Sequence, residues 1–375
     1  MNAALRHWKE AATLIVAAGR RLGADSVSRR GRFDYDVLLL KRSGKSDFMP
    51  NAYVFPGGAV DPADFSSEWL DVFQAVRNCP NFGLTRVKQP PETRPPIFAT
   101  DRQKLGSPIP GEVAFRICAL RETFEESGVL LVVPKRDETR LLESAEVRGD
   151  PGPDCGADTL CGRELTRWRA LVNQNPSNFV RMCRELQVMP NIWALHEWSN
   201  WLTPRARYGV TRFDTAFFIC CLPDAPHTAH DDREIERFQW STPPEVLQSY
   251  QDKELWIAPP QFYELGRMCR FPTLNVLRDF ARRRAAEGCE RWTPVVFPKD
   301  EQYISLLPGD RFYPSDASGE TVVDASADPQ EQTALHRIVM SDSYTTTLQI
   351  TVPPKYKHLL PLVEPSESRG PEGQR

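Results

Sequence analysis

The chain has 375 residues, with 47 lysines and arginines against 50 aspartates and glutamates, which gives a net charge of −3. This near balance argues against the strongly basic surface that binds nucleic acid or a membrane surface. The first apolar stretch, residues 11–18, is too short to span a bilayer, and the 9 cysteines form no C-x-x-C pair. We therefore expect reduced thiols in an intracellular protein, with no zinc site at Cys155 and Cys161.

The hydrophobic pattern predicts strands and helices that alternate without a regular period. Apolar runs indicate strands, and spacings of three and four indicate helices. The expected strands are 13–18, 35–40, 129–133, 211–222 and 234–240, followed by strand pairs at 295–307 and 338–352. The expected helices include 113–124, 163–173, 176–186, 261–269 and 274–287. This order predicts an α/β fold in which a mixed β-sheet is sandwiched between helices.

Changes in composition suggest the domain boundaries. We expect one domain at 9–260, interrupted by insertions at about 65–110 and 134–190. The proline-rich residues 78–110 are expected to form a long loop, and Asn175 is expected to cap the helix at 176–186. A C-terminal extension of helices and strand pairs should occupy 261–362, and the polar tail 363–375 should be disordered.

The most informative stretch is residues 121–129, with the sequence RETFEESGV. At 100° per residue, Glu122, Glu125 and Glu126 lie on the face opposite the apolar face of the predicted helix, and Gly128 is the expected C-cap. Three carboxylates repel each other there, and they also face the negative end of the helix dipole. The ordinary interpretation is a solvated acidic face; the alternative is an exposed cluster that binds a cation.

A glycine turn precedes this helix in the sequence. An apolar run leads into Pro56, Gly57 and Gly58, where proline fixes one φ angle and glycines permit positive φ and a close approach by another group. If the turn brings its carbonyls to the acidic helix, the site has only oxygen donors, which suit Mg²⁺ or Mn²⁺ better than zinc. Such an ion can bridge phosphates and activate water, so a pyrophosphate is the expected substrate.

These two motifs together resemble the Nudix box, G-x5-E-x7-R-E-U-x-E-E-x-G-U, where U is a bulky apolar residue. The second half matches at Arg121, Glu122, Glu125 and Glu126 and at the glycine and valine after them. Asp64 stands where the box has its first glutamate, and Thr123 stands where a bulky apolar residue is usual. The span from Gly58 to the arginine is about 49 residues longer than the box allows, so an insertion interrupts it.

The interrupted box, together with further stretches, is similar to the acyl-coenzyme A diphosphatase subgroup of vertebrate peroxisomal Nudix hydrolases. The similar stretches include AFRICAL (114–120), WALH (193–196), WLTP (201–204), RFDTAFF (212–218), APPQFY (258–263) and PKYKH (354–358). The resemblance implies Mg²⁺- or Mn²⁺-dependent hydrolysis of the pyrophosphate bond of coenzyme A and its acyl esters. The expected products are 3′,5′-ADP and (acyl-)4′-phosphopantetheine.

The resemblance also implies roles for the matching residues. Glu125 and Glu126 correspond to the metal ligands, and Glu122 corresponds to the box acid that acts as base or metal ligand. Arg121 corresponds to the arginine that orients the acids. The carbonyl of Gly57 or Gly58 is a further expected ligand.

Other candidates are supported more loosely. Lys41, Arg42 and Lys45 could bind substrate phosphates, or they could be a solvated basic loop. Glu234 and Asp232 are candidates for one more acid.

Several other residues have simpler structural interpretations. His196 and Trp193, Trp198 and Trp201 are more simply explained by packing, although the tryptophans could line an acyl or adenine pocket. Arg116 is expected to be a surface charge.

Two alternatives remain at this stage. One is a Nudix hydrolase of another substrate, such as a dinucleotide or an RNA cap, including RNA capped by a coenzyme A precursor. The other is a non-catalytic binding module, which would be expected to have lost the box glutamates. We expect a monomer that binds neither DNA nor a membrane. The resemblance implies a peroxisomal location, but the chain ends in EGQR, unlike the S-K-L address, so the cytosol and the mitochondrion stay open.

Overall fold

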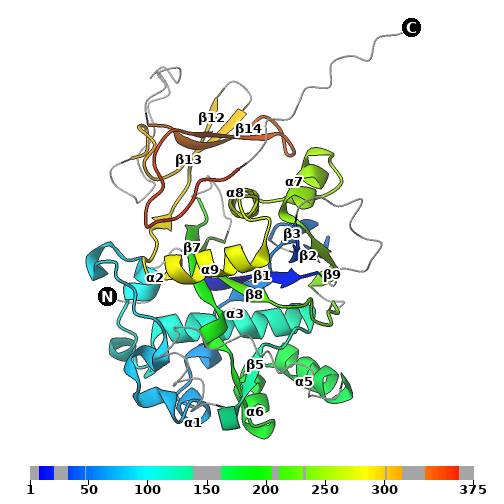
Figure 1. The fold of residues 1–375 in the computed structure, drawn as a ribbon, viewed down its shortest axis with the longest axis vertical. Coiled ribbons are helices and arrows are strands. Elements are labelled where there is room, and N and C mark those ends of the chain that lie inside the picture. Colours follow the sequence, from blue (N-terminus) through cyan, green and yellow to red (C-terminus); the bar gives the residue numbers. More distant parts are fainter. Residues whose placement is uncertain are drawn as a thin grey trace.

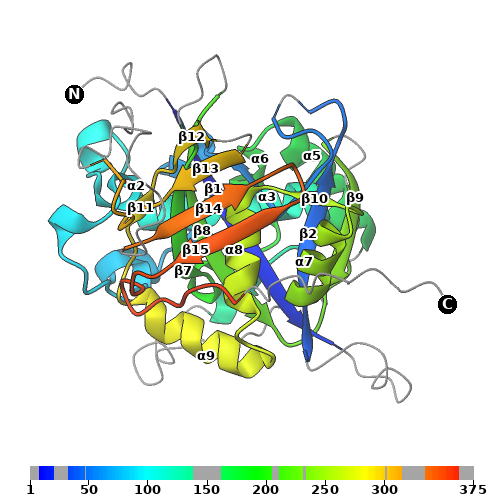
Figure 2. The same ribbon diagram turned by 90° about the horizontal axis from the view of Figure 1, so that it is seen from above.

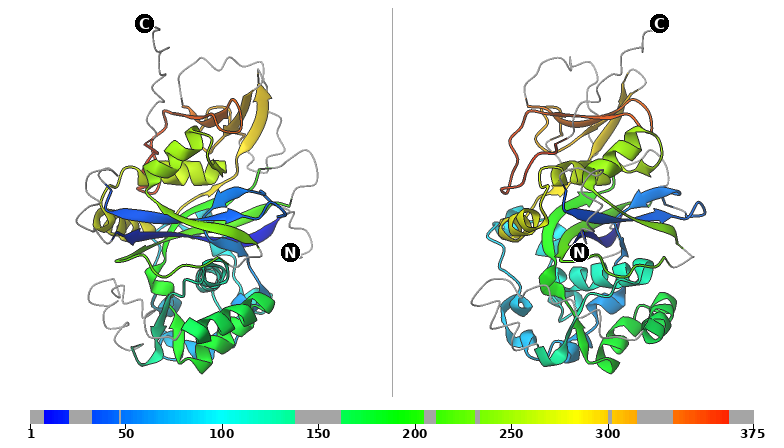
Figure 3. Two further views of the ribbon diagram at one scale, coloured as in Figure 1. Left: turned by 90° about the vertical axis from the view of Figure 1, so that its right-hand side faces the viewer. Right: turned by 45° about the vertical axis from the view of Figure 1, so that its right-hand side comes forward.

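The computed structural model describes residues 8–20, 33–46, 48–137, 162–204, 211–230, 234–299, 302–314 and 334–362. Most of the predicted linker at 19–32, most of the polar stretch at 135–160 and the tail at 363–375 lie outside these ranges. One large sheet crosses the middle of the molecule, with helices on both sides and a smaller sheet beyond the helices on one side (Figure 1 and Figure 3). The predicted mixed sheet between helices is therefore confirmed.

The large sheet has nine strands and is mixed. Its path is β10-β3-β2-β1-β8-β7-β11, with β4 paired to β1 and β9 paired to β2. The pair β1 and β8 is parallel, whereas β1 is antiparallel to β2 and β4. The strands are β1 (Lys9–Gly19), β2 (Tyr35–Arg42), β3 (Ala52–Val54), β4 (Gly57–Ala59), β7 (His196–Leu202), β8 (Phe213–Leu222), β9 (Ile235–Ser241), β10 (Trp256–Ile257) and β11 (Arg291–Trp292).

The sheet separates two hydrophobic cores because successive side chains of a strand point to opposite faces. Leu14 and Val16 of β1 join the core that contains helix α3 (Gly111–Ser127). Ile15 and Ala17 join the opposite core. That core is covered by α7 (Pro243–Gln251), α8 (Pro259–Met268) and α9 (Leu274–Ala285). The two sides of the sheet can therefore hold two unrelated sites.

Helix α3 carries the acidic motif. Pro110 precedes it and Gly128 ends it in the left-handed conformation, with φ of 72°, as the sequence predicts. The strand expected at 129–133 is shorter than predicted: β5 covers only Val132–Pro134 and pairs with β6 (Val188–Pro190). Arg116, expected at the surface, is 7% exposed, because its guanidinium stacks over Phe218 and bonds two backbone carbonyls.

The segment between β4 and α3 is part of the core. The loop expected at 78–110 instead contains short helices, and Phe82, Ile97 and Phe98 are buried in the same core as α3. The short helices of the whole segment are α1 (Trp69–Val72), α2 (Pro96–Ala99) and 3-10 turns at Pro62–Phe65, Val76–Asn78, Pro80–Gly83, Pro91–Thr93 and Gln103–Leu105. The insertion therefore covers the outer side of α3.

The second insertion adds α5 (Gly162–Gln174) and α6 (Asn178–Glu185), preceded by a turn at Lys135–Asp137. Helix α6 begins two residues later than predicted, with Ser177 at its N-cap, but the Asn175 side chain makes the predicted kind of capping contact by accepting the N–H of Ser177 at 3.0 Å. A further 3-10 turn, Ile192–Ala194, leads into β7.

The C-terminal strand pairs are confirmed and form one antiparallel sheet. It comprises β12 (Val295–Lys299), β13 (Gln302–Leu306), β14 (His336–Met340) and β15 (Thr346–Ile350). Seen from above, this sheet lies over the large one with α8 between them (Figure 2). Tyr263 of α8 contacts His336 of β14 at 3.0 Å. Among the described helices, none has the length and apolar character needed to cross a membrane.

Candidate active site

The glycine turn packs against α3 at very short range. Gly57 has φ of 154°, and a Cβ there would lie 2.4 Å from the carbonyl oxygen of Ala12. Its N–H donates to Glu126 Oε2 at 2.9 Å. A Cβ on Gly58 would lie 2.6 Å from the carboxyl carbon of Glu122. Both positions therefore need glycine: strand β1 lies against Gly57, and the Glu122 carboxylate lies against Gly58.

Arg121 connects three carboxylates and is only 2% exposed. It donates to both oxygens of Asp64 at 2.9 Å, a bidentate geometry that fixes the guanidinium. Its Nη1 also donates to Glu122 at 2.8 Å and to Glu125 at 2.9 Å. Asp64 in turn accepts the N–H of Asp61 at 2.9 Å, which closes a capping box. Asp64, although shorter than the glutamate usual in the box, thus reaches Arg121 because the turn at Pro62–Phe65 holds it there.

Burial makes the ionised acids of α3 costly. It raises the pKa of Glu126 well above its usual value, and the charge of Glu122 raises it further. Burial likewise raises the pKa of Glu122 to about 7 against the attraction of Arg121, and it raises the pKa of Glu125. The expectation of an exposed cluster is wrong for Glu126, which is 4% exposed because β4 covers it.

The donor set suits a hard divalent cation. Asp64, Glu122 and Glu125 are gathered around one guanidinium, and the charge of Glu122 also acts on Glu126, so extra positive charge would relieve the repulsion between these carboxylates. Within the residues that the structure describes, however, no three acidic, histidine or cysteine side chains already converge as metal ligands. Nη1 of Arg121 holds one oxygen of Glu122 and one of Glu125. A hard divalent cation would therefore meet acids that Arg121 already orients.

Of the remaining candidates for substrate binding or for a further acid, some act on the acids of α3 and others make contacts elsewhere. Arg42 and Glu234 both act electrostatically on Glu126, and the Glu234 carbonyl accepts the N–H of Ser43, next to Arg42. Lys41 instead pairs with Glu236 at 3.2 Å, because consecutive side chains of β2 point to opposite faces. Lys45 is exposed, and its backbone N–H donates to the Ser43 hydroxyl. Asp232 lies outside the described residues.

One contact at the site was not predicted. Arg169 of α5 donates through Nε to the backbone carbonyl of Glu125 at 2.9 Å and through Nη1 to the His230 carbonyl at 3.3 Å. It places a cation at the C-terminal end of α3, where the helix dipole favours one. No motif spacing could have indicated it, because residue 169 lies in the second insertion.

A family model for the NUDT19 Nudix domain matches residues 8–268, and one for the NUDT19 C-terminal domain matches residues 296–351. This chain belongs to the NUDT19 family of Nudix hydrolases. A chicken (Gallus gallus) protein named acyl-coenzyme A diphosphatase NUDT19 is 48% identical, over 98% of both chains. Proteins of the same name from Xenopus laevis and Homo sapiens are 47% and 40% identical, over at least 96% of each chain.

Family membership confirms the resemblance drawn from the interrupted box. The structure also shows how the two departures from the box are accommodated. Thr123 is fully buried, and its hydroxyl donates to the Ala119 carbonyl at 2.7 Å, so the polar atom is satisfied. Asp64 reaches Arg121 although the insertion separates them by 57 positions.

Proposed function

We propose that this Nudix enzyme hydrolyses the pyrophosphate bond of coenzyme A and acyl-coenzyme A, with Mg²⁺ or Mn²⁺. The products are 3′,5′-ADP and 4′-phosphopantetheine or its acyl derivative. The main support is a full set of box acids gathered against the glycine turn, in a chain that matches three named acyl-coenzyme A diphosphatases over nearly its whole length.

The proposed roles follow from the contacts. Glu122, Glu125, Glu126 and the Gly58 carbonyl would hold the metal, which supplies charge to the phosphoryl oxygens and makes bound water more acidic. Arg121, fixed by Asp64, orients Glu122 and Glu125. The N–H of Gly57 holds one oxygen of Glu126 and thereby sets the direction of the other.

Arg42 and Glu234 are the proposed neighbours on the substrate side, because both act electrostatically on Glu126. Lys41 is the weaker candidate, since Glu236 already pairs with it. The substrate carries phosphates that need countercharge, and Arg42 is placed to supply part of it.

The chemistry is tested by incubating the protein with coenzyme A, acetyl-coenzyme A, NADH and RNA capped with dephospho-coenzyme A, with Mg²⁺, Mn²⁺ or EDTA. We expect 3′,5′-ADP from the first two substrates only when metal is present. Glu126→Gln should lower kcat at least about 100-fold, because it removes a charged ligand. Glu185→Gln, at an exposed position of α6, is the control. Absence of coenzyme A turnover would reject the proposed substrate.

We also propose the peroxisome as the location and the division into 9–260 and 261–362 as the domain arrangement. The first rests on the resemblance to peroxisomal enzymes. The second is supported by the separate four-stranded sheet. Imaging of a protein tagged at its N-terminus tests the location, and limited proteolysis tests the division.

A further inference from the structure

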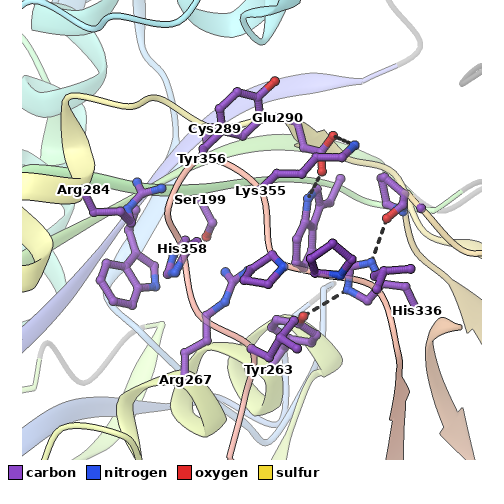
Figure 4. A pocket seen from close by; sticks show the side chains of 18 residues that line it. Ser199, Tyr263, Arg267, Arg284, Cys289, Glu290, His336, Lys355, Tyr356 and His358 are labelled. Atoms are coloured by element: carbon purple, nitrogen blue, oxygen red, sulfur yellow. Dashed lines mark hydrogen bonds and ion pairs between the residues drawn. The ribbon is translucent and has the colours of Figure 1, made fainter. Parts of the chain in front are cut away.

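A cavity lies on the other side of the large sheet from α3. Its volume is about 190 Å³, and it is bounded by β7, α8, α9 and the segment 352–360 (Figure 4). Trp198 on its wall belongs to the core opposite the one that contains α3. The cavity is therefore separate from the candidate active site.

A β-bulge in β7 shapes the cavity. The pairing of β7 with β8 shifts register between Glu197 and Ser199, so the consecutive residues Trp198 and Ser199 both line the cavity. Bulges redirect a side chain in this way. Ser199 is 6% exposed, and its hydroxyl has no hydrogen-bond partner among the described residues. An unsatisfied buried hydroxyl destabilises the empty protein.

Arg284 is a buried cation at the same cavity. It is 2% exposed, and it donates through Nη1 to the Gly288 carbonyl and through Nη2 to the Glu197 carbonyl. Its Nε has no partner within the described part of the chain. Both acceptors are neutral carbonyls, and burying a charge without a counterion is unfavourable.

The acids near Arg284 are already engaged by other cations. Arg267 binds both oxygens of Glu264, at 3.1 and 3.0 Å, and the two tryptophans of β7 donate to the same carboxylate. Arg94 binds the Glu197 carboxylate through two hydrogen bonds. At the rim, Lys355 pairs with Glu290 at 2.9 Å. Among the described residues, Arg284 is thus a cation at the cavity that donates no hydrogen bond to a carboxylate.

The walls favour a flat apolar body next to this charge. Trp198, Trp292 and Tyr356 line the cavity. Arg267 stacks on Trp292 at 4.7 Å, and the His358 ring meets Trp198 edge-on at 4.6 Å, so these walls are held in place. A volume of 190 Å³ is below the range of drug-sized pockets, so the cavity suits a small ligand.

We propose that this cavity binds a small organic anion, whose carboxylate or phosphate head contacts Arg284 and Ser199 and whose flat body lies against the tryptophan wall. The head group completes the hydrogen bonds of the serine hydroxyl and the arginine Nε and neutralises the buried charge. Because the site is on the opposite side of the sheet from α3, its occupancy does not depend on the proposed substrate.

The test uses ¹⁹F NMR of the full chain in EDTA, with 4-fluorobenzoate, 4-fluorophenyl phosphate and the neutral isostere 4-fluorobenzamide. We expect at least one anion to bind with a Kd on the order of 1 mM or tighter, and the amide at least about tenfold more weakly. The stronger anion identifies the head group. Equal binding of the amide, or no binding of either anion, overturns the proposal.

Two variants locate the bound anion. Ser199→Ala should weaken binding about tenfold, which is the loss of one hydrogen bond to a charged group, and it should not lower the melting temperature of the free protein. Arg284→Gln should remove most of the binding. Ser177→Ala, at the N-cap of α6, and Arg181→Gln, within α6, are the matched controls. If Arg284→Gln fails to fold, Ser199→Ala and the comparison with 4-fluorobenzamide still test the proposal. Unchanged binding in Ser199→Ala overturns it.

Discussion

Replacing Asp64 by asparagine isolates the buried arginine pair from the rest of the site. The substitution keeps the shape and one carbonyl oxygen but removes the charge that faces Arg121. Breaking one side of a buried ion pair costs about 3–5 kcal/mol, because the remaining charge loses its partner. Asparagine still accepts one hydrogen bond and Arg121 keeps Glu122 and Glu125, so we expect about 3 kcal/mol. That loss raises the unfolding equilibrium constant roughly a hundredfold.

Asp71→Asn provides a matched control at nearly the same ion-pair distance. Asp71 binds Arg184 at 2.8 Å, but the Asp71 side chain is 62% exposed, whereas that of Asp64 is 1% exposed. Exposed pairs contribute about 0–1 kcal/mol. Urea unfolding monitored by tryptophan fluorescence, with EDTA present in every sample, gives both losses of unfolding free energy. If the two variants lose the same small amount of stability, burial of the Arg121 pair does not govern this site and the reasoning fails.

Two further predictions concern the acids and the glycine turn. Without metal, burial raises the pKa of Glu122 from its usual 4.5 to about 7, so the folded state binds this proton more tightly; the resulting stability is present below pH 4.5 and is lost as the pH rises through 7. The melting temperature in EDTA should therefore decrease as the pH is raised from 5 to 8. The increase in melting temperature that Mn²⁺ produces should become larger over the same range. An increase that does not depend on pH would contradict the metal assignment. Gly58→Ala should reduce kcat more than about tenfold, because its Cβ would lie 2.6 Å from the Glu122 carboxyl carbon. Gly162→Ala, whose Cβ would meet nothing within 4 Å, should keep wild-type turnover, and equal kcat values in the two variants would count against the close approach.

The predicted elements with strong patterns are present in the structure. The period of three and four around Ile117 and the glycine at 128 predicted helix α3 and its end, and the apolar run at 211–222 predicted β8. A capping box at Thr242 likewise marks the start of α7. Local patterns are sufficient in these cases because the hydrogen bonds involved are themselves local.

Weak local patterns failed where packing decided the outcome. Residues 78–110 looked like a polar loop, yet Phe82, Ile97 and Phe98 are buried beneath α3. Arg116 looked like a surface charge but lies over Phe218. A sequence pattern predicts that a polar helical face is exposed to solvent. Whether a distant segment packs on that face, and which one, is not indicated by the local sequence.

By itself, the sequence determined the acidic motif, the glycine turn and their membership in one box, because residue type and short spacing set that chemistry. Only the tertiary structure decided that Asp64 binds Arg121 across the insertion and that Glu126 is buried against β4. It alone brought Ser199 and Arg284 to one cavity. These contacts join residues about 60 to 90 positions apart, and their geometry depends on strand pairing and core packing that no short window of sequence encodes.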